Sequence, residues 1–190
     1  MSEKESILAN PAPLGLAGFG MTTILLNLAN MGVFGVNSII VAMGIFYGGM
    51  AQIIAGIMEF RKGNTFGTLA FTSYGLFWLT LVFIIISSVE RPAVTPDNAT
   101  WAAYLVIWGL FTSMMFLGTL KANRALQTVF LSLAILFFLL AASRFIPQLI
   151  PVAGVEGVFC GFSAFYLSMA EVLNETHKRT VLPIGPVKAD

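Results

Sequence analysis

The sequence predicts an all-α integral membrane protein, and two observations carry that prediction. Of its 190 residues, 57% are hydrophobic and 10% are charged, whereas a soluble domain carries roughly 25% charged residues. Residues 6–58, 63–89, 98–120 and 125–143 contain no Asp, Glu, Lys or Arg. Because a membrane-spanning helix needs about 20 apolar residues, the first stretch accommodates two spans and each of the others accommodates at least one.

Six helices are expected, over residues 13–30, 37–60, 65–88, 101–120, 123–145 and 152–174. Gly and Asn residues in "NMGVFGVN" mark the first turn, and the loop "VERPAVTPDNAT" separates the third and fourth helices. Pro147 and Pro151 interrupt the chain before the sixth helix. We therefore expect one transmembrane domain, residues 10–174, between tails at residues 1–9 and 175–190.

The distribution of Lys and Arg predicts the orientation. With six spans both termini lie on one side of the membrane, which collects eight of the ten basic residues and leaves Arg91 and Arg144 opposite. Because basic residues concentrate in cytoplasmic loops, both tails are expected in the cytoplasm. The opening "MSEKES" carries both signs of charge and does not resemble a signal peptide.

The beginnings of the odd-numbered helices resemble one another. "KGNTFGTLAFTSY" (62–74) aligns with "KANRALQTVFLSL" (121–133), which pairs Lys with Lys and Asn with Asn and sets Tyr74 opposite Leu133. Asn10 stands nine residues before Phe19, one residue short of the same spacing. A genuine repeat would form three in-out hairpins around a pseudo-axis, with Phe19, Tyr74 and Leu133 at one depth. Four identities in thirteen positions are also compatible with chance.

Small residues recur every four positions in "GIFYGGMAQIIAG" (44–56), among them Gly44 and Gly48. Such faces let helix backbones approach closely in lipid. They serve packing within one chain or contact between copies, and the sequence does not separate the two.

Polar side chains inside the spans are candidates for a transport path, because unsatisfied groups in hydrocarbon cost several kcal/mol. Asn27 and Gln52 are either interhelical glue or path lining. Glu59 and Glu171 end even-numbered helices, and intramembrane carboxylates can relay protons. Arg61 and Lys62 stand close to Glu59 in the sequence, which favours an interfacial salt bridge for that carboxylate.

Several function classes are poorly supported by the sequence. Metal-ligand, nucleophile and phosphate-loop patterns are absent, so an enzyme, a bound metal or a cofactor is not expected. There is no basic patch for nucleic acid. A mildly polar, mostly uncharged interior suits small, weakly polar or weakly acidic solutes better than metal ions.

The heptapeptide "NPAPLGL" (10–16) resembles the signature of the acetate uptake transporter family, the bacterial succinate–acetate permeases and their fungal relatives. "GFGMTTILLNL", "AMGIFYGG", "KGNTFG", "FTSYG" and "RTVLPIG" follow in the order typical of that family. The resemblance implies an inner-membrane permease for acetate, and for succinate in the bacterial branch, with proton-coupled uptake. It also implies a hexamer in which each protomer carries its own pore, in a bundle similar to the acid-gated urea channels.

The resemblance also assigns residues to the pore. It implies an apolar constriction at Phe19, Tyr74 and Leu133 and a pore-facing Ala164 that affects substrate size. With it we expect Ser73 and Ser132 along the pore and Glu59 or Glu171 in proton coupling. The residues expected at the pore mouth and in substrate binding are Asn10, Pro11, Ala12, Pro13, Leu14, Gly15, Leu16, Thr22, Asn27 and Gln52.

The expected mechanism begins with acetate bound by amide dipoles, hydroxyls and Gln52, including the N–H groups of Leu14 and Gly15 at a helix start. The constriction is crossed more easily as acetic acid, or with a co-moving proton, because a bare carboxylate there costs several kcal/mol. Succinate, a dianion, is expected to move more slowly. The alternatives are a facilitative channel for acetate or for small neutral solutes such as urea or ammonia, and a membrane scaffold or sensor that transports nothing. The expected partners are acetate, succinate, protons, the lipid bilayer and copies of the chain.

Overall fold

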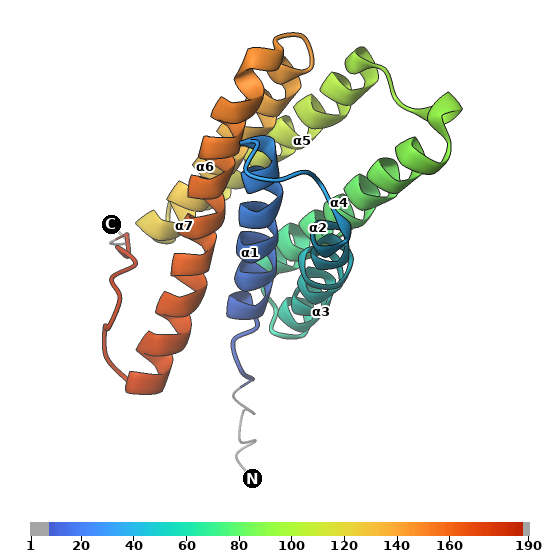
Figure 1. Ribbon diagram of the computed structural model, residues 1–190. Helices are drawn as coiled ribbons and strands as arrows, with labels where there is room; N and C mark the ends of the chain where they lie inside the picture. Colours follow the sequence, from blue (N-terminus) through green and yellow to red (C-terminus); the bar gives the residue numbers. More distant parts are fainter. Residues whose placement is uncertain (1–7, 188–190) are drawn as a thin grey trace.

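Six long helices form a bundle in the computed structural model, which describes residues 8–187 (Figure 1). All six are long and apolar enough to cross a membrane, which confirms the predicted fold class and number of spans. Short 3₁₀ turns, η2 (Pro92–Val94) and η3 (Pro147–Leu149), precede the fourth and sixth spans. The spans are α1 (Ala12–Asn30), α2–η1–α3 (Ser38–Met43, Gly44–Ala51, Gln52–Arg61), α4 (Thr65–Glu90), α5 (Asn98–Gly118), α6 (Arg124–Ser143) and α7 (Ile150–His177).

Asparagine and aspartate side chains begin four of the six spans. Asn64 accepts a hydrogen bond from the Gly67 amide at 3.0 Å, and Asn123 accepts one from the Leu126 amide at 2.8 Å. These bonds satisfy amide groups that a helix start leaves without partners. The aligned asparagines of the two similar segments therefore share a capping role. At the start of α5, the Thr100 amide donates to Asp97 and lowers the pKa of that carboxyl.

The sixth span begins earlier and ends later than predicted. It runs from Ile150 to His177, whereas residues 152–174 were expected. Pro151 lies in the first turn, where its missing N–H removes no helical hydrogen bond, so it begins the helix instead of interrupting it.

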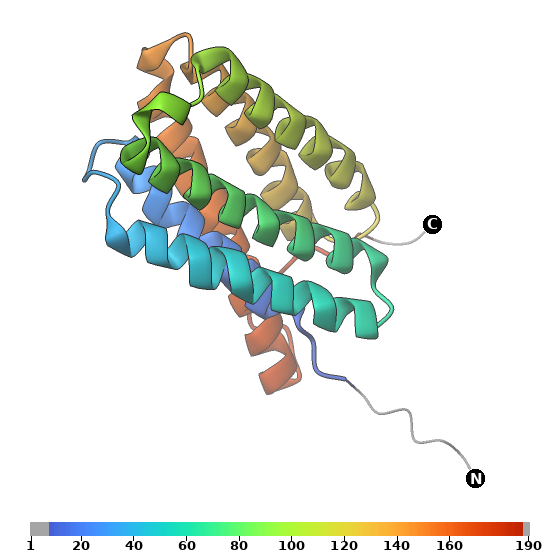
Figure 2. The ribbon, with the colours of Figure 1, turned by 90° about the vertical axis from the view of Figure 1, so that its right-hand side faces the viewer.

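The first span, α1, lies against α7 and the second span (Figure 1). On the other side of the bundle α5 and α6 lie side by side (Figure 2). Glycines allow the closest approach: a Cβ on Gly20 would be 2.6 Å from the Gly161 carbonyl oxygen. In the predicted small-residue face, a Cβ on Gly44 would be 2.5 Å from the Val82 side chain and one on Gly48 would be 2.9 Å from the Trp78 ring, so these two glycines serve packing within the chain, one of the two roles expected for them.

The start of α1 and the end of α7 lie at the same end of the bundle, where the Asn10 side chain donates to Glu171 at 2.8 Å. Beyond α7 the chain turns back to the start of α6. There the amides of Arg124 and Ala125 donate to the carbonyls of Gly185 and Ile184, at 2.8 and 3.1 Å. We call this end of the bundle the tail side and the opposite end the loop side.

Candidate functional site

Two cavities converge on the same side chains from opposite ends of the bundle. The tail-side cavity has a volume of about 280 Å³ and reaches from Asn10 to Phe19, Tyr74 and Leu133. The loop-side cavity, of about 210 Å³, reaches from Arg144 to Phe19 and Leu133. We call Phe19, Tyr74 and Leu133 the collar. The repeat alignment and the family resemblance both predict that these three residues meet, and the structure brings them together.

The collar is closed and apolar. None of its three side chains is more than 6% exposed, and the ring centroids of Phe19 and Tyr74 are 6.2 Å apart. The Tyr74 hydroxyl lies 2.9 Å from the Thr112 hydroxyl, which itself donates to the Trp108 carbonyl at 2.7 Å. Because the Thr112 proton is used in that way, Tyr74 is the donor of the pair. Its hydroxyl is therefore held by α5, which leaves the ring of Tyr74 to line the cavity.

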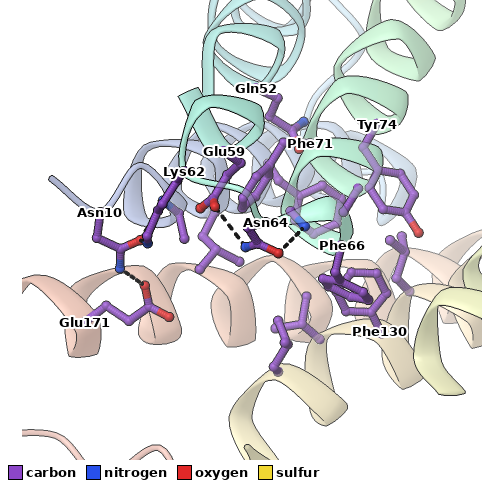
Figure 3. Close-up of a pocket in the computed structure, with 18 residues that line it drawn as sticks. Asn10, Gln52, Glu59, Lys62, Asn64, Phe66, Phe71, Tyr74, Phe130 and Glu171 are labelled. Carbon is purple, nitrogen blue, oxygen red and sulfur yellow. Dashed lines mark hydrogen bonds between the residues drawn. The ribbon is translucent and has the colours of Figure 1, made fainter. Parts of the chain in front are cut away.

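Polar side chains gather in the tail-side cavity (Figure 3). Lys62 donates to the Asn10 side-chain oxygen at 3.0 Å, and the Asn10 amide donates to Glu171. Asn64 donates to Glu59 at 2.8 Å. Asn10, just before α1, thus bridges Lys62 and Glu171, and Asn64, at the start of α4, holds Glu59. A ligand in this cavity therefore meets one basic and two acidic side chains.

Glu59 does not form the interfacial salt bridge that its neighbours in the sequence favour. Its side chain is completely buried, and within residues 8–187 its only hydrogen-bond donor is Asn64, which leaves the Oε1 atom without a partner. The end of α3 turns Glu59 toward α4, where a Cβ on Gly67 would be 2.9 Å from the carboxylate carbon. Arg61 is exposed, and Lys62 reaches Asn10 instead.

Gln52 and Asn27 bond to their own helices and also line the cavities. Gln52 donates to the Gly48 carbonyl at 2.6 Å and lines the tail-side cavity. Asn27 donates to the Thr23 carbonyl at 2.9 Å and lines the loop-side cavity. The sequence posed interhelical glue and path lining as alternatives; both side chains line a cavity, and the hydrogen bonds that they donate stay within their own helices.

Four residues expected along the path line neither cavity. Ser73 and Ser132 each precede a collar residue by one position, and one residue of an α-helix turns the side chain by about 100°. Thr22 is fully buried, and its hydroxyl lies 3.4 Å from the Met43 carbonyl. Ala164 is also fully buried, in the contact between α1 and α7, where its Cβ would lie 3.4 Å from a Cβ on Gly20.

The heptapeptide at the start of α1 contributes three residues to the tail-side cavity, which are Asn10, Ala12 and Leu16. The amides of Leu14 and Gly15 both point at the Pro11 carbonyl oxygen, at 3.1 and 3.4 Å. The sequence suggested that these two N–H groups bind a carboxylate. That prediction is wrong, because both groups already donate to the Pro11 carbonyl within the first turn of the helix. Pro11, Pro13, Leu14 and Gly15 do not line the cavity.

Several lining residues were not singled out from the sequence. Lys62 was expected only as a possible ion-pair partner of Glu59, and Asn64 only as a position shared by two similar segments, although a Lys and an Asn at the start of a span are a usable signal. Phe71 and Phe130 line the tail-side cavity, and Arg144 lines the loop-side cavity. The chain has 17 phenylalanines, and nothing in the sequence distinguishes those that line a cavity from those that face lipid.

Comparisons with known proteins show what this chain is similar to. Residues 2–188 match the model of the GPR1/FUN34/yaaH family. The succinate-acetate/proton symporter SatP of Escherichia coli K12 is 59% identical over 180 residues, which cover 94% of this chain and 96% of that protein. A solved structure of the bacterial acetate channel SatP matches with a TM-score of 0.91 at 59% identity, over 94% of this chain and 99% of that one. Acetate permease A of Emericella nidulans is 32% identical over 93% of this chain and 66% of its own length.

Proposed function

The chain belongs to the GPR1/FUN34/yaaH family, and on that basis we propose that it carries acetate, and succinate more slowly, across the cell inner membrane. The path runs through each chain, across the collar. The chains assemble as a homohexamer of bundles similar to the urea channels, with both tails in the cytoplasm. The related proteins with assigned roles reported above are named as transporters or channels, which favours transport over catalysis.

One observation carries the proposal: the two cavities end on the same pair of side chains, Phe19 and Leu133. A solute in either cavity therefore contacts collar residues that also line the other cavity. The methyl group of acetate can pack against an apolar collar. Its carboxylate cannot enter the collar cheaply, because an unpaired charge in apolar surroundings costs several kcal/mol of free energy. Small size and protonation therefore favour passage, and the dianion succinate is disfavoured.

Proton coupling is proposed to use Glu59, with Glu171 as the second candidate. Among the described residues, the Oε1 atom of Glu59 is a buried acceptor without a partner, in the cavity that acetic acid enters after crossing the collar from the loop side. A carboxylate there can accept the proton of the acid, which leaves acetate and a neutral Glu59. Lys62, which lines the same cavity, offsets the charge of the acetate that forms.

Uptake of labelled acetate into proteoliposomes tests the proposal. Under an inward proton gradient, acetate is expected to accumulate above its external concentration. Uptake equal to that of empty liposomes would overturn transport altogether. The control is the same preparation with the gradient collapsed by a protonophore.

A second candidate, a facilitative acetate channel, is favoured by one observation. The solved relative at 59% identity is described as an acetate channel. A channel that passes the acetate anion alone does not respond to the proton gradient, whereas transport together with a proton does. In the same proteoliposomes, the dependence of the initial uptake rate on that gradient, above the rate of empty liposomes, therefore separates the two mechanisms.

A further inference from the structure

One face of α5 packs against the ring of Tyr74 from outside the path. Phe111 and Thr112 follow Trp108 by three and four positions, a spacing that places all three on one side of a helix. The ring centroids of Trp108 and Phe111 lie 6.1 and 5.6 Å from that of Tyr74. None of the three belongs to the described residues that line the two cavities. This face of α5 therefore supports a collar residue without lining the path itself.

Thr112 is the polar member of this face, and its side chain is completely buried. Its hydroxyl donates to the Trp108 carbonyl at 2.7 Å and lies 2.9 Å from the hydroxyl of Tyr74. A hydroxyl has one proton and two positions that accept, so Thr112 accepts the proton of Tyr74. That proton is then not available to a solute in the collar. Figure 3 shows the Tyr74 hydroxyl pointing away from Glu59 and Lys62.

The hydroxyl of Tyr74 is the one polar group among the three collar side chains, since those of Phe19 and Leu133 are hydrocarbon. While Thr112 holds it, the collar presents two aromatic rings and an aliphatic side chain to a solute. A solute that carries a hydroxyl of its own finds no side-chain partner for that group in the collar. Because a polar group that loses water without gaining a partner is unfavourable, such a solute crosses more slowly than an unhydroxylated one of the same size.

Loss of the Thr112 hydroxyl changes what the collar presents. A buried phenol without a partner is unfavourable, and Tyr74 is only 4% exposed. The ring of Tyr74 already lines the tail-side cavity, so a turn of the side chain toward that cavity brings its hydroxyl to water or to a solute. The collar then offers a hydrogen-bonding group at its narrowest point.

We propose that Thr112 is a positioning residue for selectivity: by holding the hydroxyl of Tyr74 out of the path, it makes the collar discriminate against hydroxylated monocarboxylates. The inference rests on the proposed function and adds selection by polarity to selection by size. The bond also joins two parts of the collar, because it ties α4, which carries Tyr74, to α5, which lies against the α6 helix of Leu133.

Lactate and propionate test this role, because they have the same carbon chain and differ by one hydroxyl. Initial rates of uptake of each, labelled, are measured in proteoliposomes of the full chain and corrected for empty liposomes. Thr112→Val keeps the shape of the side chain and removes the acceptor, and it is expected to raise the lactate-to-propionate ratio about fivefold, the size of one net hydrogen bond. Thr112→Ser retains the hydroxyl and should keep the ratio of the unmodified chain. Thr112→Ala removes the same hydroxyl and replaces Thr112→Val if that variant does not fold.

A second background separates positioning from a loss of packing. In Tyr74→Phe there is no phenol to hold, so adding Thr112→Val should leave the lactate-to-propionate ratio unchanged. Looser packing would instead raise lactate and propionate fluxes alike, with or without that phenol.

Thr80→Val is the control outside the collar. The hydroxyls of Thr80 and Tyr104 lie 2.8 Å apart and join the same two helices, α4 and α5, and neither residue is among the described residues that line the cavities. This variant should keep the ratio of the unmodified chain. A ratio that Thr112→Val leaves unchanged in chains that transport acetate, or raises equally in the Tyr74→Phe background, overturns the role of Thr112. Absence of acetate uptake by the unmodified chain would instead contradict the proposed function.

Discussion

Glu59 combines complete burial with a carboxylate oxygen that no donor of residues 8–187 reaches. A buried carboxylate that is not fully paired is costly when ionised. Binding a proton or a donor ligand relieves that cost. This single side chain therefore links the occupancy of the tail-side cavity to protonation.

Replacing Glu59 by Gln removes the titratable group and keeps an oxygen that accepts from Asn64. Glu59→Gln is expected to abolish the accumulation of acetate under an inward proton gradient while downhill flux continues. Labelled acetate in proteoliposomes measures both quantities. Glu175→Gln is the control, because Glu175 is exposed, and accumulation that persists in Glu59→Gln would exclude this residue from coupling.

Leu133 is a collar residue whose side chain lines both cavities. Leu133→Ala should admit larger monocarboxylates, so lactate flux rises relative to acetate flux. The lost packing lowers the free energy of unfolding by about 2–5 kcal/mol. Gel filtration therefore has to show that the variant is still folded. Leu131→Ala, at a position that is 47% exposed on the same helix, should leave the lactate-to-acetate ratio unchanged. A folded Leu133→Ala protein with an unchanged ratio would contradict the collar assignment.

Among the elements, the six spans and most of their ends follow from the sequence. Charge-free stretches fix the spans, and an Asn or Asp before a span supplies its cap, as Asn64 does for α4. The π-helical segment η1 (Gly44–Ala51) was not predicted, because small residues four apart are equally compatible with an α-helix. Its geometry depends on neighbours: a Cβ on Gly18 of α1 would lie 2.5 Å from the Tyr47 carbonyl oxygen. Such a contact between distant segments leaves no local pattern.

The contact between α1 and α7 has no room for a methyl group at Gly20. Gly20→Ala would bring its Cβ within 2.6 Å of the Gly161 carbonyl oxygen, so the two backbones have to separate. Overpacking of this kind costs about 1–3 kcal/mol. The expected result is a lower thermal midpoint of the purified protein in detergent. Gly35→Ala, where no atom lies within 4 Å of the added Cβ, should leave the midpoint unchanged.

For the whole molecule, the collar could be predicted and most of its surroundings could not. Tyr74 and Leu133 each stand ten residues after a capping Asn, so equal helix geometry carries both to one depth. The direction in which Ala164 or Ser132 points depends instead on how six helices rotate against one another. The bond between Asn10 and Glu171 joins residues 161 positions apart, and no sequence pattern encodes that contact.

Passage of acetate through the collar of each chain is tested most directly by blocking the collar covalently. In Leu133→Cys, a membrane-permeant methanethiosulfonate reagent adds a bulky group to the introduced thiol. The unmodified chain is the control, because its single cysteine, Cys160, is completely buried. A pore within each chain predicts that acetate flux falls in proportion to the fraction of chains modified, as read by mass spectrometry. Undiminished flux through fully modified chains would contradict a path across Phe19, Tyr74 and Leu133.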